Sequence, residues 1–273
     1  MSPRFTKTEV ASALGVPEVD FLGAGSFGDT WKVGDRAVKI ICDETYPPAR
    51  VARELGGLQR VDSPHIVKLV ESGVITLGDK QRPIFTFEYV PGGDLQERIA
   101  NGDRPSTSES ESLLQGLLTG LYALHRADGT VHRDIKPGNI ALRAGNWNDP
   151  VILDLGLAKS LSETTFTRYP GRIGTDPFMA PEQLMGKRAR KAADLFAVGV
   201  TVRLAITGRH PFYEGSTNLT IDEAVRKIES GPEPIAQTLP EVTRAVLDRL
   251  VSPRESERGS ARSNLRKLGV PVD

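Results

Sequence analysis

The chain changes character at Pro91-Gly92-Gly93. Ahead of this point, short apolar segments alternate with turn residues, a pattern typical of β-strands. Residues 19–33 and 36–42 predict two or three strands, and the Gly34-Asp35 pair between them predicts a tight hairpin turn. Further along, residues 65–76 and 82–90 predict two more strands, separated by polar residues. The first part of the chain is therefore expected to form a small sheet.

One helix is predicted within this first part, over residues 48–61, where apolar residues recur at helical spacing. After residue 93, helical spacing dominates. Residues 106–127 predict a long amphipathic helix, and Ser108 with Glu111 has the spacing of a capping box at its start. Further helices are predicted over the segments 181–186, 192–207, 220–230, 240–251 and 260–268. The pattern predicts an α+β protein with a small β-rich lobe and a larger, mainly helical lobe.

Composition narrows the classes of partner. The chain has 273 residues with 35 basic and 35 acidic side chains, so its formal net charge gives no electrostatic ground for nucleic acid as a partner. Cys42 is the single cysteine, which excludes an intramolecular disulfide and a cysteine-rich metal site. No apolar run approaches the roughly 18 residues that span a bilayer, and the first residues lack a secretory apolar run. We therefore expect a cytoplasmic protein without membrane insertion.

The segment Val131–Ile140, VHRDIKPGNI, is too polar for a core. Asp134 is a candidate to accept the proton of a substrate hydroxyl that attacks a phosphoryl group, and Lys136 could neutralise the charge that develops there. Asn139 and Asp154 offer hard oxygen ligands suited to Mg²⁺. The alternative is a polar loop that makes Asx turns and carries no chemistry.

A second candidate for phosphate binding is GAGSFG at residues 23–28, which a strand follows. Glycines there let backbone N–H groups approach phosphate oxygens, and a following strand argues against a dinucleotide-binding fold. Lys39 lies inside the apolar strand AVKI, where a lysine is costly unless an anion such as Glu54 pairs with it. The alternatives are a plain glycine-rich hairpin and a lysine that extends to solvent from an edge strand.

Together these segments resemble the catalytic domain of eukaryotic-like (Hanks-type) serine/threonine protein kinases, from about Phe21 to about Leu268. The resemblance lies in GAGSFG, AVK, Glu54, FEYV, HRDIKPGN, DLG, GTDPFMAPE and DLFAVG, which occur in the family's order. It implies a bilobal α+β fold in a single kinase domain over residues 1–273, with an N-lobe over about 1–87, a hinge over 88–93 and a C-lobe over 94–273. It also implies ATP and Mg²⁺, for which Mn²⁺ can substitute, as cofactors.

The resemblance assigns a role to each matching residue. Asp134 would be the catalytic base, assisted by Lys136 and Thr175, and Lys39 would contact the ATP phosphates while paired with Glu54. Asn139 and Asp154 would hold the metal. The remaining residues that would surround ATP are Gly23, Ala24, Gly25, Ser26, Phe27, Gly28, Thr30, Ala37, Phe87, Glu88, Val90 and Ala141.

The same resemblance indicates protein substrates with Ser or Thr acceptors, because Lys136 and Thr175 match the serine/threonine branch. Arg133 directly before Asp134 resembles kinases that are activated by phosphorylation, and Thr164, Thr165 and Thr167 are the candidate autophosphorylation sites. Self-association for phosphorylation in trans is compatible with this expectation. Two structural roles are also implied: Glu182 would pair with Arg258, and Asp194 would brace the backbone of the HRD loop.

Thr30 stands where the family usually has Val, and DLG replaces the commoner DFG but keeps the metal-binding Asp. Gly56 and Gly57 follow Glu54 and predict a loose helix there, so that the Lys39–Glu54 pair would form only in an activated state.

The alternative function is a pseudokinase, which is a nucleotide-binding scaffold without catalysis. Loss of Lys39, Asp134, Asn139 or Asp154 would indicate this alternative. All four are present. A small-molecule phosphotransferase is disfavoured by GTDPFMAPE, which resembles a platform for peptide substrates.

Overall fold

The computed structural model describes residues 2–25, 27–43, 61–127, 130–154, 177–187, 190–216 and 219–273. The chain divides into two compact units. The first comprises Met1–Asp62 and Val67–Tyr89, and the second comprises Ser63–Ile66 and Val90–Asp273. Three predicted site residues, Ser26, Glu54 and Thr175, lie outside the described residues, as do the helix predicted over 48–61 and the three candidate phosphorylation sites.

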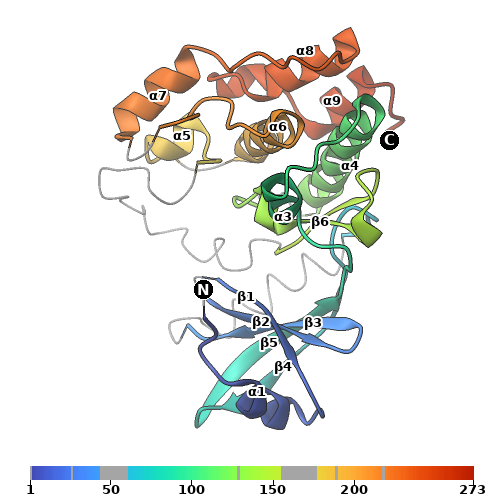
Figure 1. The fold of residues 1–273 in the computed structure, drawn as a ribbon, viewed down its shortest axis with the longest axis vertical. Coiled ribbons are helices and arrows are strands. Elements are labelled where there is room, and N and C mark those ends of the chain that lie inside the picture. The colour runs from blue at the N-terminus through green and yellow to red at the C-terminus, as the bar shows by residue number, and fades with distance from the viewer. Residues whose placement is uncertain are drawn as a thin grey trace. The chain divides into compact units, whose positions relative to one another are not determined.

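The first unit contains a five-stranded antiparallel sheet of order β1-β2-β3-β5-β4 (Figure 1). The strands are β1 Asp20–Ala24, β2 Gly28–Val33, β3 Arg36–Ile41, β4 Leu69–Leu77 and β5 Lys80–Glu88. The hairpin predicted at Gly34-Asp35 is confirmed, with Gly34 in the left-handed region at φ 57°. The second hairpin turns at Gly78-Asp79, both with positive φ, so β5 begins two residues earlier than the sequence predicted.

A helix that the sequence analysis did not predict, α1 (Lys7–Leu14), packs against β4. Thr6 and Glu9 form a capping box at its start, and Gly15 ends it in the left-handed region. Val10 is fully buried in a cluster with Trp31 and Ile40, so α1 is part of the hydrophobic core of this unit.

The second unit is mainly helical, with a two-stranded sheet of β6 (Ile140–Leu142) and β7 (Pro150–Ile152). Its helices are α3 Leu95–Ala100, α4 Thr107–Arg126, α5 Pro181–Leu184, α6 Lys191–Thr207, α7 Ile221–Glu229, α8 Glu241–Leu250 and α9 Ala261–Lys267. All six helices predicted for this part are confirmed within about two residues at each end, whereas α3, β6 and β7 were not predicted. No helix in the described ranges is both long and apolar enough to cross a membrane.

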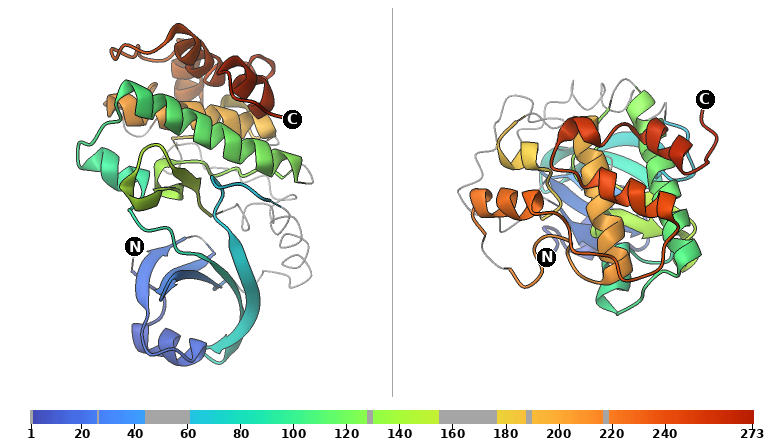
Figure 2. Two further views of the ribbon diagram at one scale, coloured as in Figure 1. Left: turned by 90° about the vertical axis from the view of Figure 1, so that its right-hand side faces the viewer. Right: turned by 90° about the horizontal axis from the view of Figure 1, so that it is seen from above.

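Helix α6 is the centre of this unit and contacts both α4 and α8 (Figure 2). It is apolar on all sides, as expected for a helix surrounded by others, and Phe196, Val198 and Val200 are fully buried. The buried position of α6 matters for function because Asp194 lies in its first turn.

The predicted capping box of α4 is wrong by two residues. Ser106 adopts the extended cap conformation and its hydroxyl accepts the N–H of Glu109, while the Glu109 carboxylate accepts the N–H of Ser106 at 2.8 Å. Ser108 lies two residues after the cap, inside the helix. The same Ser-x-x-Glu spacing occurs twice in this serine-rich segment, and the helix begins at the first occurrence.

We expect Ser106→Ala to lower the free energy of unfolding by about 1 kcal/mol, because the first N–H groups of α4 lose their acceptor. Ser108→Ala is the matched control and should change it by less than about 0.5 kcal/mol, as for most exposed sites. Urea denaturation of both variants tests the assignment, and a larger loss for the Ser108 variant would reverse it.

Candidate functional site

The Asp194 side chain holds the polar loop that lies between α4 and β6 and contains His132, Arg133 and Asp134. The Asp194 carboxylate accepts the backbone N–H of His132 at 2.8 Å and that of Arg133 at 2.7 Å. It also contacts His125 Nε2 at 2.9 Å, and its side chain is 1% exposed. The bracing role that the resemblance implied for Asp194 is therefore confirmed.

His132 is fully buried and ties the loop to the strand that follows it. Its Nε2 donates to the Leu153 carbonyl at 2.9 Å, while Nδ1 accepts the N–H of Asp134 at 3.3 Å. This pattern assigns the proton to Nε2, because Nδ1 acts as the acceptor. A second link runs from the N–H of Leu153 to the Asn139 carbonyl at 2.8 Å. These bonds place the backbone just before Asp154 beside Asn139.

Asp134, Lys136 and Asn139 lie together at the surface of the loop. Lys136 Nζ contacts both Asp134 carboxylate oxygens at 3.1 and 3.2 Å. Asn139 Nδ2 donates to the Asp134 carbonyl at 2.7 Å and to its carboxylate at 3.1 Å. The Asp134 side chain is 15% exposed, so this carboxylate is both oriented and open to a ligand.

Two residues of the site have a strained backbone. Arg133 has φ 66° and Asp154 has φ 49°, in the left-handed region that side chains other than glycine rarely occupy. Such a conformation costs of order 1–3 kcal/mol and persists only where surrounding contacts impose it. Here the Asp194 carboxylate holds Arg133, and the Asn139–Leu153–His132 bonds hold the segment before Asp154.

The available oxygens fit a hard divalent cation. Asn139 uses Nδ2 toward Asp134, which leaves its amide oxygen Oδ1 as the atom able to bind metal, and Asp154 offers a carboxylate for the same role. Mg²⁺ typically takes only one or two protein oxygens and completes its shell with water and phosphate. Within the described residues there is no cluster of three His, Cys, Asp or Glu side chains that would favour an all-protein metal cage instead.

In the first unit, the hairpin that β1 and β2 form contains Gly23, Gly25 and Gly28 and is called the glycine hairpin below. These glycines differ in how closely other atoms approach them. A Cβ on Gly28 would lie 1.9 Å from the Ile40 carbonyl oxygen, so close approach of β2 to β3 requires glycine there. Around Gly23, by contrast, a Cβ would meet nothing within 4 Å, which leaves its backbone open. The Gly25 N–H already donates to the Gly28 carbonyl at 2.8 Å. Of the three glycines, only Gly23 and Gly25 therefore have room for a ligand, and Gly25 would offer it space but no N–H in this conformation.

Lys39 and Ala37 of β3 lie on one face of the sheet. Their cross-strand partners on β2 are Thr30 and Lys32, respectively. Lys39 is 7% exposed, so its ammonium group is largely withdrawn from water. Phe87 and Glu88 lie at the end of β5, with Phe87 opposite Ala37. Of the residues expected around ATP, Val90 and Ala141 belong to the second unit, and both are buried.

The predicted Glu182–Arg258 pair is confirmed. Arg258 donates to both carboxylate oxygens of Glu182 at 2.7 and 2.9 Å, and its side chain is fully buried. Glu182 belongs to α5, and Phe178 and Met179 lie just ahead of that helix. These two residues line a small cavity of about 10 Å³ together with Asp134, so the start of α5 lies against the polar loop.

A model of the protein kinase domain family matches residues 17–268. The chain belongs to the protein kinase family. Its curated relatives include a probable serine/threonine-protein kinase, PkwA, of Thermomonospora curvata, 33% identical over 84% of this chain and 30% of the relative. PkaA of Streptomyces coelicolor is 27% identical over 92% of this chain and 49% of that kinase. PknK of Mycobacterium tuberculosis is 30% identical over 95% of this chain and 24% of that kinase.

Among solved structures, the crystal structure of Rad53 1-466 in complex with AMP-PNP aligns with a TM-score of 0.69 and 25% identity. The alignment covers 90% of this chain and 64% of that chain. These matches confirm the predicted kinase fold and the predicted family, in which the relatives named here are serine/threonine-protein kinases. The chain spans between a quarter and a half of the length of the three curated relatives named above.

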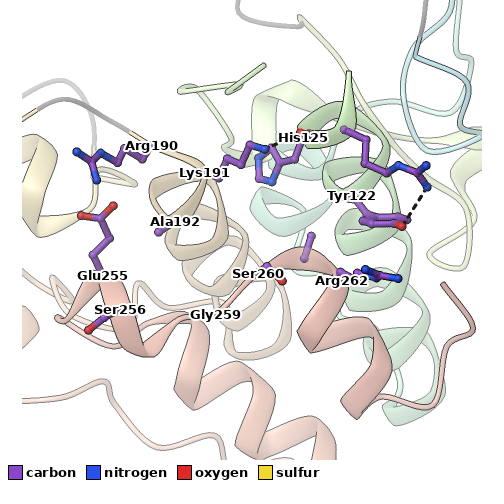
Figure 3. Close-up of a pocket in the computed structure, with 12 residues that line it drawn as sticks. Tyr122, His125, Arg190, Lys191, Ala192, Glu255, Ser256, Gly259, Ser260 and Arg262 are labelled. Carbon is purple, nitrogen blue, oxygen red and sulfur yellow. Dashed lines mark hydrogen bonds between the residues drawn. The ribbon is translucent and has the colours of Figure 1, made fainter. Parts of the chain in front are cut away.

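A larger cavity of about 830 Å³ lies elsewhere in the second unit, between α4, α6 and α9 (Figure 3). Its lining includes Arg126, Arg190, Lys191 and Arg262 but none of the residues predicted to bind ATP or metal. One of its lining residues, His125, contacts Asp194 through Nε2, and Asp194 in turn holds the polar loop.

His210 was not singled out by sequence and proves to hold the segment ahead of α5. Its Nε2 donates to the Pro177 carbonyl at 3.0 Å, and Nδ1 accepts the N–H groups of Phe212 and Tyr213 at 3.2 and 3.1 Å. Both ring nitrogens of the neutral imidazole therefore take part in hydrogen bonds. Burial lowers the pKa of His210 from 6.5 to about 4.

Because the folded protein holds His210 neutral, the unfolded chain binds its proton first as the pH falls. Stability is therefore expected to fall between about pH 6.5 and about pH 4, by about 1 kcal/mol at pH 5.5 relative to pH 7. Thermal unfolding followed across this range tests the prediction. His210→Asn, whose amide oxygen can replace Nδ1 as acceptor, should flatten the profile, and an unchanged profile would contradict the assignment.

Proposed function

We propose that this domain is an ATP- and Mg²⁺-dependent serine/threonine protein kinase, with Mn²⁺ able to replace Mg²⁺. The observation that supports it most is the Asp134–Lys136–Asn139 group, held on a strained loop by the buried Asp194. Backbone strain that surrounding contacts impose is concentrated at active sites and ligand-binding sites. Lys39, Asp134, Asn139 and Asp154 are all present, and loss of any of them would have indicated a nucleotide-binding scaffold.

In this proposal Asp134 accepts the proton of a substrate Ser or Thr hydroxyl as its oxygen forms a bond to the γ-phosphorus. The bond between that phosphorus and the β–γ bridging oxygen breaks, and ADP is the leaving group. Lys136, 3.1 Å from Asp134, lies where its ammonium group can bind the transferring phosphoryl oxygens. Thr175 would contact both residues.

Asn139 and Asp154 would hold the metal ion, which supplies charge neutralisation at the nucleotide phosphates when bound. Lys39, paired with Glu54, would bind the α and β phosphates. The remaining residues proposed to surround ATP are Gly23, Ala24, Gly25, Ser26, Phe27, Gly28, Thr30, Ala37, Phe87, Glu88, Val90 and Ala141. The Rad53 structure was solved with AMP-PNP, which supports a nucleotide ligand for this chain.

Protein substrates and autophosphorylation at Thr164, Thr165 or Thr167 belong to the same proposal, as does a cytoplasmic location where ATP is available. Support for phosphorylation comes from Arg133, which directly precedes Asp134 in the sequence and whose guanidinium could bind a phosphothreonine. Transient self-association would serve this reaction.

Incubation with γ-labelled ATP and a general protein acceptor tests the proposal. We expect label on Ser or Thr in the presence of Mg²⁺, and none when EDTA removes the metal. ATP binding without transfer to any acceptor in Mg²⁺ would support a scaffold instead. Mass spectrometry of residues 160–175 after the reaction would locate the autophosphorylation sites.

A further inference from the structure

The segment ahead of the family match, residues 2–16, is bonded to the glycine hairpin through Arg4. Arg4 Nη2 donates to the Gly25 carbonyl at 2.8 Å, and Nη1 pairs with the Asp29 carboxylate. The backbone N–H of Arg4 donates to the other Asp29 oxygen at 2.6 Å. One arginine thus connects the tip of the hairpin to its second strand.

The Asp29 end of this connection is buried. The Asp29 side chain is 1% exposed although it follows Gly28 directly in a glycine-rich hairpin. A buried carboxylate without a cation is costly, and the planar guanidinium can serve a carboxylate and a carbonyl together. The Arg4 side chain is 38% exposed, so this ion pair has its guanidinium at the surface and its carboxylate buried.

The hairpin tip is fixed on its other side by the sheet. The Phe27 carbonyl accepts the N–H of Cys42 at 2.7 Å and that of Asp43 at 3.2 Å, both just after β3. Gly25 is held to Gly28 across the hairpin. Arg4 attaches the same tip to a segment outside the sheet.

That segment is itself anchored. Arg82 lies 5.0 Å from the centre of the Phe5 ring, and Val10 of α1 is fully buried against the sheet. Arg4 is therefore presented by a folded element and not by a loose terminus.

We infer that Arg4 is a positioning residue for the glycine hairpin, and that the segment ahead of the kinase match sets the affinity of this domain for the triphosphate of ATP. The inference rests on the proposed function, because it assumes that the hairpin covers nucleotide. With Arg4 in place, the hairpin needs no reordering when nucleotide binds. Without it, the tip must be ordered at the expense of binding free energy.

The test compares Arg4→Ala, Arg4→Lys and Lys7→Ala in direct titrations with ATP and in kinase assays. Arg4→Ala should raise the Kd and KM for ATP about tenfold, the loss expected for a charge-assisted hydrogen bond, while kcat changes less. Arg4→Lys keeps the charge near Asp29 but lacks the fork that reaches Gly25, so an intermediate increase is expected. Lys7→Ala removes an exposed ion pair with Asp20 in the same segment and should behave as wild type.

Thermal unfolding of each variant separates lost positioning from lost folding. If Arg4→Ala does not fold, Arg4→Lys decides, and a wild-type Kd and KM in that variant would overturn the inference. Unchanged Kd and KM in folded Arg4→Ala would overturn it as well. If the wild-type protein fails to bind ATP, the proposed function is what fails.

Discussion

Asp194→Ala should lower kcat for phosphoryl transfer about 100-fold, as expected when catalytic groups shift by about 1 Å, and should reduce the free energy of unfolding by about 3 kcal/mol. The Asp194 carboxylate holds the N–H groups of His132 and Arg133 and contacts His125, all in a buried setting. Alanine would leave these groups without an acceptor and would release Arg133 from its left-handed conformation. Asp134, the next residue, would then lose its fixed direction.

Asp222 provides a matched control, because it also lies in the first turn of a helix, α7, but is exposed. Asp222→Ala should change stability by less than about 0.5 kcal/mol and leave kcat as it is. Urea denaturation and steady-state kinetics of both variants give the comparison. Equal behaviour of the two would mean that Asp194 does not brace the loop.

Glu182→Ala should destabilise the domain by about 3–5 kcal/mol, because it leaves a charged guanidinium buried without its partner. Arg258 is fully buried, bonds both Glu182 oxygens and lies over the Phe196 ring at 4.9 Å. Arg258 also donates to the carbonyls of Ser252 and Ala192. Replacement of Arg258 should therefore cost at least as much as replacement of Glu182.

The exposed pair Arg254–Glu257 is the control for this prediction. Its two side chains are 78% and 48% exposed, so Glu257→Ala should have little effect on stability. Chemical denaturation of the two variants measures the difference. A Glu182 variant as stable as the Glu257 variant would show that the buried pair contributes nothing to the fold.

Periodicity predicted the sheet and the longer amphipathic helices of the second unit, such as α4 and α8, because their apolar spacing repeats over several strands or turns. It did not predict α1, which has only 8 residues and whose clearest signal is the Thr6–Glu9 capping box. Strands β6 and β7 have three residues each, too few to show alternation. The capping box of α4 was misplaced because two Ser-x-x-Glu pairs overlap in one segment.

The candidate site was predictable where motif residues are close in sequence, as with Asp134, Lys136 and Asn139. The bracing Asp194 and the Glu182–Arg258 pair came from the family resemblance. The Arg4–Asp29 pair could not be predicted, because nothing in local spacing selects one partner for an arginine among 35 acidic side chains. Likewise, the double use of the His210 ring depends on three backbone groups that only the fold brings together.

The central claim, that Asp134 directs phosphoryl transfer from ATP, is tested most directly by Asp134→Asn. The amide keeps the shape of the side chain but cannot accept the substrate proton as a base. We predict a loss of about 10²- to 10⁴-fold in the rate of phosphate incorporation, with an unchanged Kd for ATP and unchanged thermal stability. Equal rates of incorporation in wild type and Asp134→Asn would contradict the account.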